Sequence, residues 1–138
     1  MSFHYSRRRW RAGRGSSLIE FAIIAVLLML ILFASIEFGR MLLVYTSVAN
    51  SARVGCRYAI THGSDNPANI AAIQTVVKNF AASAPLNTAN LTITVTYPDA
   101  ATTPGSRVDV KVVYPYDPFT ILPLNVNLGS VSEGIITF

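Results

Sequence analysis

The most regular feature of the sequence is a run of 19 residues, Leu18 to Ile36, in which only Glu20 and Ser35 are polar. At a rise of 1.5 Å per residue, a helix of this length is about 28 Å long, which is sufficient to cross the hydrocarbon layer of a bilayer. A core helix of a water-soluble protein rarely needs a run that is apolar on every face. The pattern therefore predicts a membrane-spanning helix over 18–36.

An amphipathic pattern follows the apolar run without a break. No proline occurs between Glu37 and Ile60, and small or apolar residues recur at steps of three and four. This predicts a single helix over 16–60, whose apolar face packs by default on the C-terminal part of the chain. The expected apolar face contains Tyr45, Ala49, Ala52, Cys56 and Ala59, and the expected polar face contains Thr46, Asn50, Arg53 and Arg57.

A helix-breaking stretch at 62–67 separates this helix from a shorter one. Asn66 is expected to cap the second helix, with Pro67 at its first position and Pro85 beyond its end. An apolar stripe at helical spacing requires a covering sheet or helix, and it contains Ile70, Ile73, Val77, Phe80, Ala81 and Ala84.

Strand signals follow, with apolar and polar residues alternating over 91–97 and 108–114. The connection 98–106 contains two prolines and a glycine, which favours an antiparallel hairpin with its apolar face on the helices. After the second strand, regular strand structure should be interrupted by Pro115, Pro118 and Pro123. Residues 130–138 are expected to return as a third strand, with Ile135, Ile136 and Phe138 partly buried. The predicted fold class is α+β.

Arginines are concentrated before the span, and they define the expected topology. Five of the 11 basic residues precede Gly15, whereas Arg40 alone lies close after the span. This bias predicts a cytoplasmic N-terminus and an extracytoplasmic C-terminal domain, hence a single-pass protein of the inner membrane. Three parts are expected: a leader over 1–15, the long helix over 16–60 and an α+β domain over 61–138. A cleavable secretory signal would have a shorter apolar region.

Charge and chemistry narrow the function classes further. The net charge of +4 belongs to the leader, because the chain from Ser16 holds six basic and seven acidic residues. We therefore expect no nucleic-acid binding. Cys56 is the only cysteine and is expected to be a packing residue, with an intermolecular disulfide as the alternative. His62 is expected to be a solvated loop residue. No catalytic, metal-ligand or cofactor motif is present, so we expect no cofactor and no enzyme activity.

One motif lies at the start of the apolar run. The basic leader ends in Gly15, and the chain continues S-S-L-I-E-F, with Glu20 and Phe21 at the end of this motif. This arrangement resembles the class III signal of type IV pilins. The resemblance implies cleavage after Gly15 by a prepilin peptidase, which makes Ser16 the first residue and Glu20 the fifth.

Two further motifs resemble the TadE-like family of minor pilins and pseudopilins. The family's E-F-G-R pattern matches Glu37–Arg40, and its A-A-R-x-G-A-R-Y-A pattern matches 51–59, where Ser51 and Cys56 replace alanines. The resemblance implies a structural and assembly component of a tight-adherence (Flp-type) pilus and secretion apparatus. Implied partners are the bilayer, a prepilin peptidase, other Tad pilins and assembly platform proteins. The implied location is the inner membrane or the pilus.

Two residue roles and two other functions stay open on sequence alone. Glu20 either lies among the lipid headgroups or pairs with a cation inside an assembly. Arg53 and Arg57, four residues apart, are either solvated or in contact with a neighbouring subunit. The alternative functions are an uncleaved membrane-anchored envelope scaffold and a membrane-tethered receptor or enzyme. The last would need convergent polar residues in a pocket.

Overall fold

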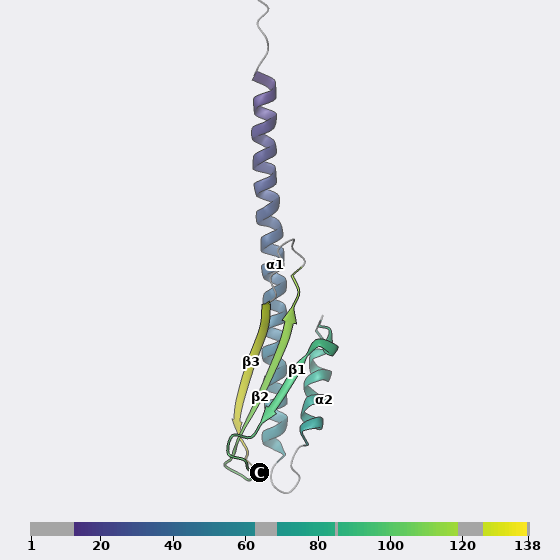
Figure 1. Cartoon of the computed structure of the whole chain (residues 1–138), viewed down its shortest axis with the longest axis vertical. Coiled ribbons are helices and arrows are strands. Elements are labelled where there is room, and N and C mark those ends of the chain that lie inside the picture. Colours follow the sequence, from purple (N-terminus) through teal and green to yellow (C-terminus); the bar gives the residue numbers. More distant parts are fainter. Residues whose placement is uncertain (1–12, 63–68, 85, 119–125, 138) are drawn as a thin grey trace, which may run out of the picture. The chain divides into compact units, whose positions relative to one another are not determined.

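The computed structural model describes residues 13–62, 69–84, 86–118 and 126–137 of the 138-residue chain. The chain divides into two compact units, residues 1–36 and residues 37–138. The elements, labelled in Figure 1, are α1 (Gly13–Thr61), α2 (Ile70–Ala81), the 3-10 turn η1 (Thr88–Asn90), β1 (Thr92–Thr96), β2 (Arg107–Tyr116) and β3 (Val126–Ile135).

Helix α1 confirms the prediction of one uninterrupted helix through both patterns, since its 49 residues contain no proline. The buried face of its second half is only partly as predicted. Ala52, Cys56 and Ala59 are buried as expected, but Tyr45 is exposed. Each residue turns a helix by about 100°, so a face centred on Val44 directs Tyr45 away from the core. The other buried positions are Val48, Ser51 and Gly55.

Helix α2 begins three residues later than the sequence suggested. Its N-cap is Asn69, whose side-chain oxygen accepts a hydrogen bond from the backbone N–H of Ala71 at 3.1 Å. The predicted cap at Asn66 is therefore wrong, and Asn66, Pro67 and Pro85 lie outside the described residues. The stripe is confirmed for the row Ile73, Val77 and Ala81, which is fully buried, whereas Ile70 and Phe80 remain 45% and 39% exposed.

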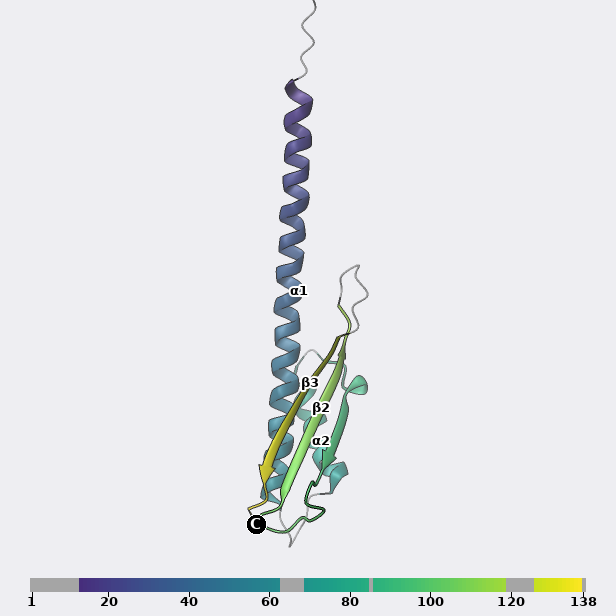
Figure 2. The same ribbon diagram turned by 60° about the vertical axis from the view of Figure 1, so that its left-hand side comes forward.

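The three strands form an antiparallel sheet in the order β1-β2-β3, which confirms the predicted hairpin and the third strand. The inner face of β2 is the centre of the core, because Val108, Val110 and Val112 have no exposed surface. Figures 1 and 2 show the second half of α1 and the helix α2 on the same side of this sheet. Within the described residues, the opposite side of the sheet carries no helix.

Strand bounds differ from the prediction at Pro115. Strand β2 continues through Pro115, which lies opposite Asn127 of β3. Strand β1 pairs with β2 only as far as Val113, so no strand lies beside Pro115 on that side. The N–H that proline lacks is therefore not required for pairing with β1. The third strand begins at Val126 rather than Ser130. Its alternation leaves Ile135 58% exposed, whereas Ile136 is buried; residues 119–125 and Phe138 lie outside the described part.

Two glycines allow the helices and the sheet to approach closely. A β-carbon on Gly55 of α1 would lie 2.4 Å from Val77 Cγ2 of α2 and 3.3 Å from Val110 Cγ1 of β2. A β-carbon on Gly134 of β3 would lie 2.8 Å from Cys56 Sγ and 2.8 Å from Ile60 Cγ2, both on α1. Side chains at these positions would therefore force the layers apart. The resulting architecture is a pilin-like α+β fold.

Candidate assembly site

The predicted cleavage and assembly residues all belong to the first part of α1. Gly15, Ser16, Glu20 and Phe21 are helical and exposed. A β-carbon on Gly15 would meet nothing within 4 Å. In this part of the chain the structure therefore leaves Gly15 and its neighbours without steric protection by the described residues.

The same part of the chain displays an apolar surface. Helix α1 is long and apolar enough to cross a membrane, and none of its most apolar stretch is buried within the structure. Side chains from Leu18 to Ile36 such as Phe21, Leu27 and Phe33 are more than half exposed. Apolar patches of this extent require lipid or protein around them.

A polar clamp joins α1 to the end of β2. The hydroxyl of Tyr116 donates a hydrogen bond of 2.5 Å to Oε1 of Glu37. The ring itself is buried, with 4% of the residue exposed. Burial and the carboxylate of Glu37 raise the pKa of Tyr116. The phenol is therefore a permanent donor at neutral pH, and it fixes the C-terminal end of β2 against the helix.

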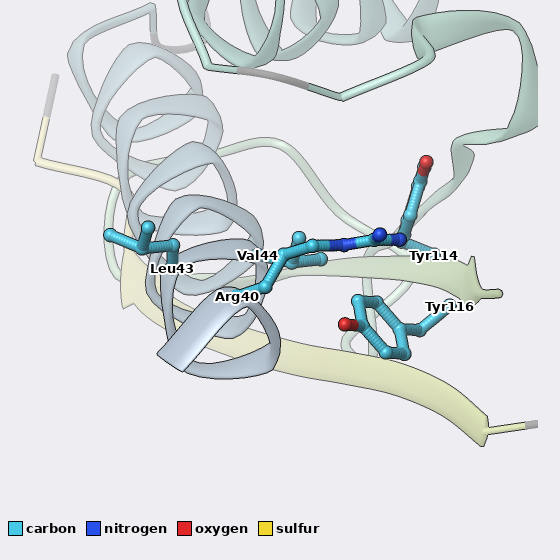
Figure 3. A pocket seen from close by; sticks show the side chains of 5 residues that line it. All are labelled: Arg40, Leu43, Val44, Tyr114 and Tyr116. Carbon is cyan, nitrogen blue, oxygen red and sulfur yellow. The ribbon is translucent and has the colours of Figure 1, made fainter. Parts of the chain in front are cut away.

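Arg40 completes the clamp one helical turn further along. Its guanidinium carbon lies 5.2 Å from the centroid of the Tyr116 ring, a cation–π distance. Its Nη2 atom donates a 2.8 Å hydrogen bond to the carbonyl oxygen of Asp117. Figure 3 shows the arginine side chain reaching from α1 across the tyrosine ring. A cavity of about 160 Å³ lies beside it, lined by Arg40, Leu43, Val44, Tyr114 and Tyr116.

Arg53 and Arg57 lie on the face of α1 that points away from the sheet, as the sequence predicted. Both are exposed, and the buried residues Gly55 and Cys56 lie between them in the sequence, on the opposite side of the helix. Arg53 Nη1 reaches Asn50 Oδ1 at 3.5 Å. No carboxylate among the described residues forms a recorded ion pair with either arginine.

The lone cysteine and the outer histidine have structural environments. Cys56 is buried and faces β3, where the side chain of Ser132 hydrogen-bonds it; burial raises the pKa of the thiol. This supports the packing role that was predicted. His62 is only partly exposed, contrary to the prediction of a solvated loop residue. Its ring lies 4.1 Å from that of Tyr58, and Nδ1 is 2.8 Å from the Tyr58 carbonyl oxygen.

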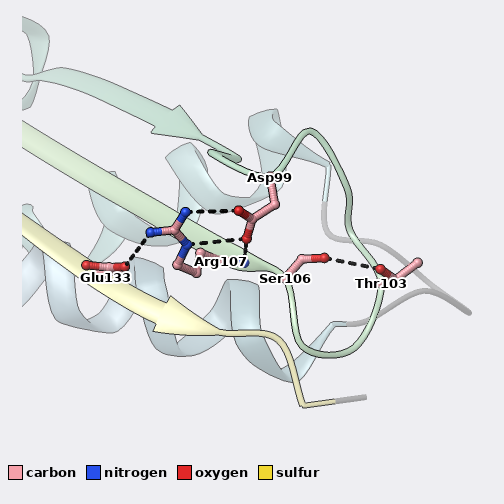
Figure 4. A network of polar contacts seen from close by, with 5 residues as sticks. All are labelled: Asp99, Thr103, Ser106, Arg107 and Glu133. Carbon is pink, nitrogen blue, oxygen red and sulfur yellow. Dashed lines mark hydrogen bonds and ion pairs between the residues drawn. The ribbon is translucent and has the colours of Figure 1, made fainter.

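An ion-pair network closes the β1–β2 connection on the outer face of the sheet. Arg107 donates to Asp99 from its backbone N–H at 2.8 Å and from Nη2 at 3.0 Å, while Nη1 lies 3.8 Å from Glu133 (Figure 4). These hydrogen bonds hold the pKa of Asp99 below its usual value. At the same turn, the hydroxyls of Thr103 and Ser106 are 3.1 Å apart. The network stabilises the hairpin. Its charged groups contact one another, which accounts for them as structural rather than catalytic residues.

The polar and charged groups of the described residues make contacts between segments of the protein. They contain no group of three histidine, cysteine, aspartate or glutamate side chains that could hold a metal ion. The cavity beside Arg40 has its one cation engaged by Asp117 and Tyr116. The polar groups therefore join elements of the fold and shape its surfaces.

Comparison with known families agrees with these features. The model of the TadE-like protein family matches residues 15–57, so this part of the chain is similar to that family. Searches of curated proteins and of solved structures gave no match. The family match covers the apolar run, the Glu37–Arg40 motif and Gly55.

The structure gives physical roles to motif residues that the sequence identified only by their residue types. Glu37 and Arg40 hold Tyr116, and Gly55 admits Val77 and Val110. Sequence reasoning found the motif residues but missed Tyr116 as their partner. Glu37 and Tyr116 are 79 positions apart, and no local pattern relates them.

Proposed function

We propose that this protein is a minor pilin or pseudopilin, a structural and assembly component of a bacterial Flp/Tad pilus and secretion apparatus. The observation that carries the proposal is the TadE-like match, which begins at Gly15 and runs through the apolar helix. The pilin-like α+β fold supports it. The role is non-enzymatic, in keeping with a family whose members are generally structural pilus components.

The proposed location is the inner membrane, with residues 18–36 as the span. The five arginines before Gly15 favour a cytoplasmic N-terminus, so unit 37–138 lies outside the membrane. Reporter fusions after Phe138 test this orientation. A periplasmic reporter should be active and a cytoplasmic one inactive. Activity only in the cytoplasm would contradict both the topology and the pilin assignment.

The proposed maturation step is cleavage after Gly15 by a prepilin peptidase. It removes the arginine-rich leader and leaves the Ser16 ammonium at the new N-terminus. In an assembly, Glu20 of one subunit then pairs with this ammonium on another, which offsets the cost of a carboxylate at the edge of the hydrocarbon. The partners are other Tad pilins and assembly platform proteins, with Phe21 in the same helix contact.

Two substitutions separate processing from assembly. Gly15→Leu should leave the precursor in the membrane, because glycine before the cut has no side chain to exclude from a narrow active site. Gly13→Leu is the matched control and should be processed. Glu20→Ala should be processed normally yet co-purify poorly with the other pilins. The mature N-terminus is measured by mass spectrometry. Retention of Met1–Gly15 in cells with an active prepilin peptidase would indicate an uncleaved envelope scaffold instead.

A further inference from the structure

The outer face of the sheet carries a pair of carboxylates in an unfavourable position. Asp109 of β2 and Glu133 of β3 are directly opposite each other in the strand register. Like charges in this arrangement destabilise a sheet. Arg107 compensates only partly, since its closer partner is Asp99 at 3.0 Å and it lies 3.8 Å from Glu133. Lys111 is the other cation on this face of β2.

Exposed apolar side chains flank the same carboxylates. Along the outer face of β3, Glu133 lies between Val131 and Ile135, which are 59% and 58% exposed. The Glu133 side chain is itself 59% exposed. An arginine suits such a row, because its aliphatic stem packs on apolar surface while its guanidinium binds a carboxylate.

The arginines of α1 lie at the same level as this row, on the opposite side of the domain. Gly55 packs against Val110, the neighbour of Asp109, and Cys56 packs against Gly134, the neighbour of Glu133. Arg53 and Arg57 bracket these contacts along the helix, and both point away from the sheet. Unit 37–138 therefore presents Arg53 and Arg57 on one face and, at a matching height on the other, the carboxylates of Asp109 and Glu133 beside Arg107 and Lys111.

We propose that these two faces dock on each other in neighbouring copies of this chain. Arg53 and Arg57 of one copy lie on the row Val131, Glu133 and Ile135 of the next, with Asp109 beside it. The spacing agrees, because two residues four apart on a helix are separated by about 6 Å, and alternate residues on a strand by about 6.8 Å.

A second copy is the occupant that the charges and geometry favour. A translation perpendicular to α1 brings the arginine face of one unit against the carboxylate face of the next without inverting it. Both copies then keep one orientation, as a shared membrane demands. The contact is heterologous, so it can add further copies in a row. The inference rests on the proposed function only through this shared membrane orientation.

Cysteine cross-linking in the full-length chain tests the docking with the charges intact. Asn50→Cys is placed in one tagged copy and Val131→Cys in a second, both with Cys56→Ala, and the two are co-expressed in membranes. The positions lie on opposite faces of one chain, so a disulfide between the tags reports two copies. Asn79→Cys on α2 is the matched control. Docking predicts a heterodimer yield about tenfold above the control, whereas equal yields overturn the proposal.

A charge exchange in the same assay tests the pairing itself. Arg57→Glu in the Asn50→Cys copy should lower the yield about tenfold, and Glu133→Lys in the other copy should restore it. Lys78→Glu makes the same charge change on α2 and should have no effect. An undiminished yield with Arg57→Glu, or no recovery with Glu133→Lys, contradicts the docking.

The outcomes also separate this inference from the proposed function. A chain that is processed to Ser16 and co-purifies with other pilins, yet gives no specific cross-link, refutes the self-docking alone. A specific cross-link in a chain that keeps its leader refutes the processing and leaves the docking intact.

Discussion

Gly55 of α1 lies against Val77 of α2 so closely that a β-carbon on the glycine would be 2.4 Å from Val77 Cγ2. Val77 is fully buried, and its branched side chain has little freedom to move aside. The contact explains why a glycine, which weakens a helix, is present in the middle of α1. It ties the two helices to β2 at one point, because Val110 is the next neighbour of the same position.

Gly55→Ala should therefore destabilise unit 37–138 by about 1–3 kcal/mol through overpacking. The measurement is thermal unfolding of the full chain in detergent, followed by near-ultraviolet circular dichroism. Gly39→Ala is the control, because a β-carbon there meets nothing within 4 Å. It should stabilise the helix by up to about 1 kcal/mol. Equal effects of the two substitutions would contradict the close approach.

Substitution of Ile73 by alanine should cost more stability than substitution of Phe80, although phenylalanine is the larger residue. Ile73 is fully buried, so Ile73→Ala should cost about 2–5 kcal/mol. Phe80 is 39% exposed, so Phe80→Ala should cost only about 1–2 kcal/mol rather than the value of a fully buried aromatic residue. Denaturant unfolding of the full chain measures both. A larger loss for Phe80 would show that this ring has a partner that the monomer lacks.

Tyr116→Phe tests the hydrogen bond between Tyr116 and Glu37 separately from the rest of the clamp. The substitution keeps the buried ring and its contact with Arg40 but removes the hydroxyl that donates a hydrogen bond to Glu37. A loss of about 1–3 kcal/mol is expected, as for other hydrogen bonds to charged groups. Tyr114→Phe is the control, because its hydroxyl accepts only a 3.5 Å bond from the Asn87 N–H. Its effect should stay within about 0.5 kcal/mol, and a similar loss in both variants would exclude a special role for Glu37.

Acid should weaken the hairpin through Asp99. The hydrogen bonds from Arg107 lower the pKa of Asp99 in the folded state. Their contribution is present above the unfolded pKa, about 3.9, and is lost as the pH falls through the lower folded value. Arg107→Gln should therefore flatten the fall in melting temperature below about pH 4. Lys111→Gln, a second exposed cation of β2, should leave the slope unchanged; identical slopes for the wild type and Arg107→Gln would contradict the linkage.

The sequence determined those features of this protein that depend on residues close together in the chain. The apolar run of 18–36 and the absence of proline up to Ile60 specify one long helix. The alternation over 91–97 and 108–114 specifies a hairpin and the face that it buries. The motif from Gly15 to Phe21 is likewise local, so the family resemblance could be recognised without coordinates.

The tertiary structure alone decided the features that depend on pairs far apart in the chain. The local pattern indicated Asn66 as the cap of α2, but the helix begins after Asn69, where the row of Ile73 and Val77 can reach the core. The clamp between Glu37 and Tyr116 spans 79 positions. The level of Arg57 relative to Glu133 follows from the close packing of Cys56 on Gly134. Such distances are set by how the layers pack, and periodicity along one chain contains no measure of them.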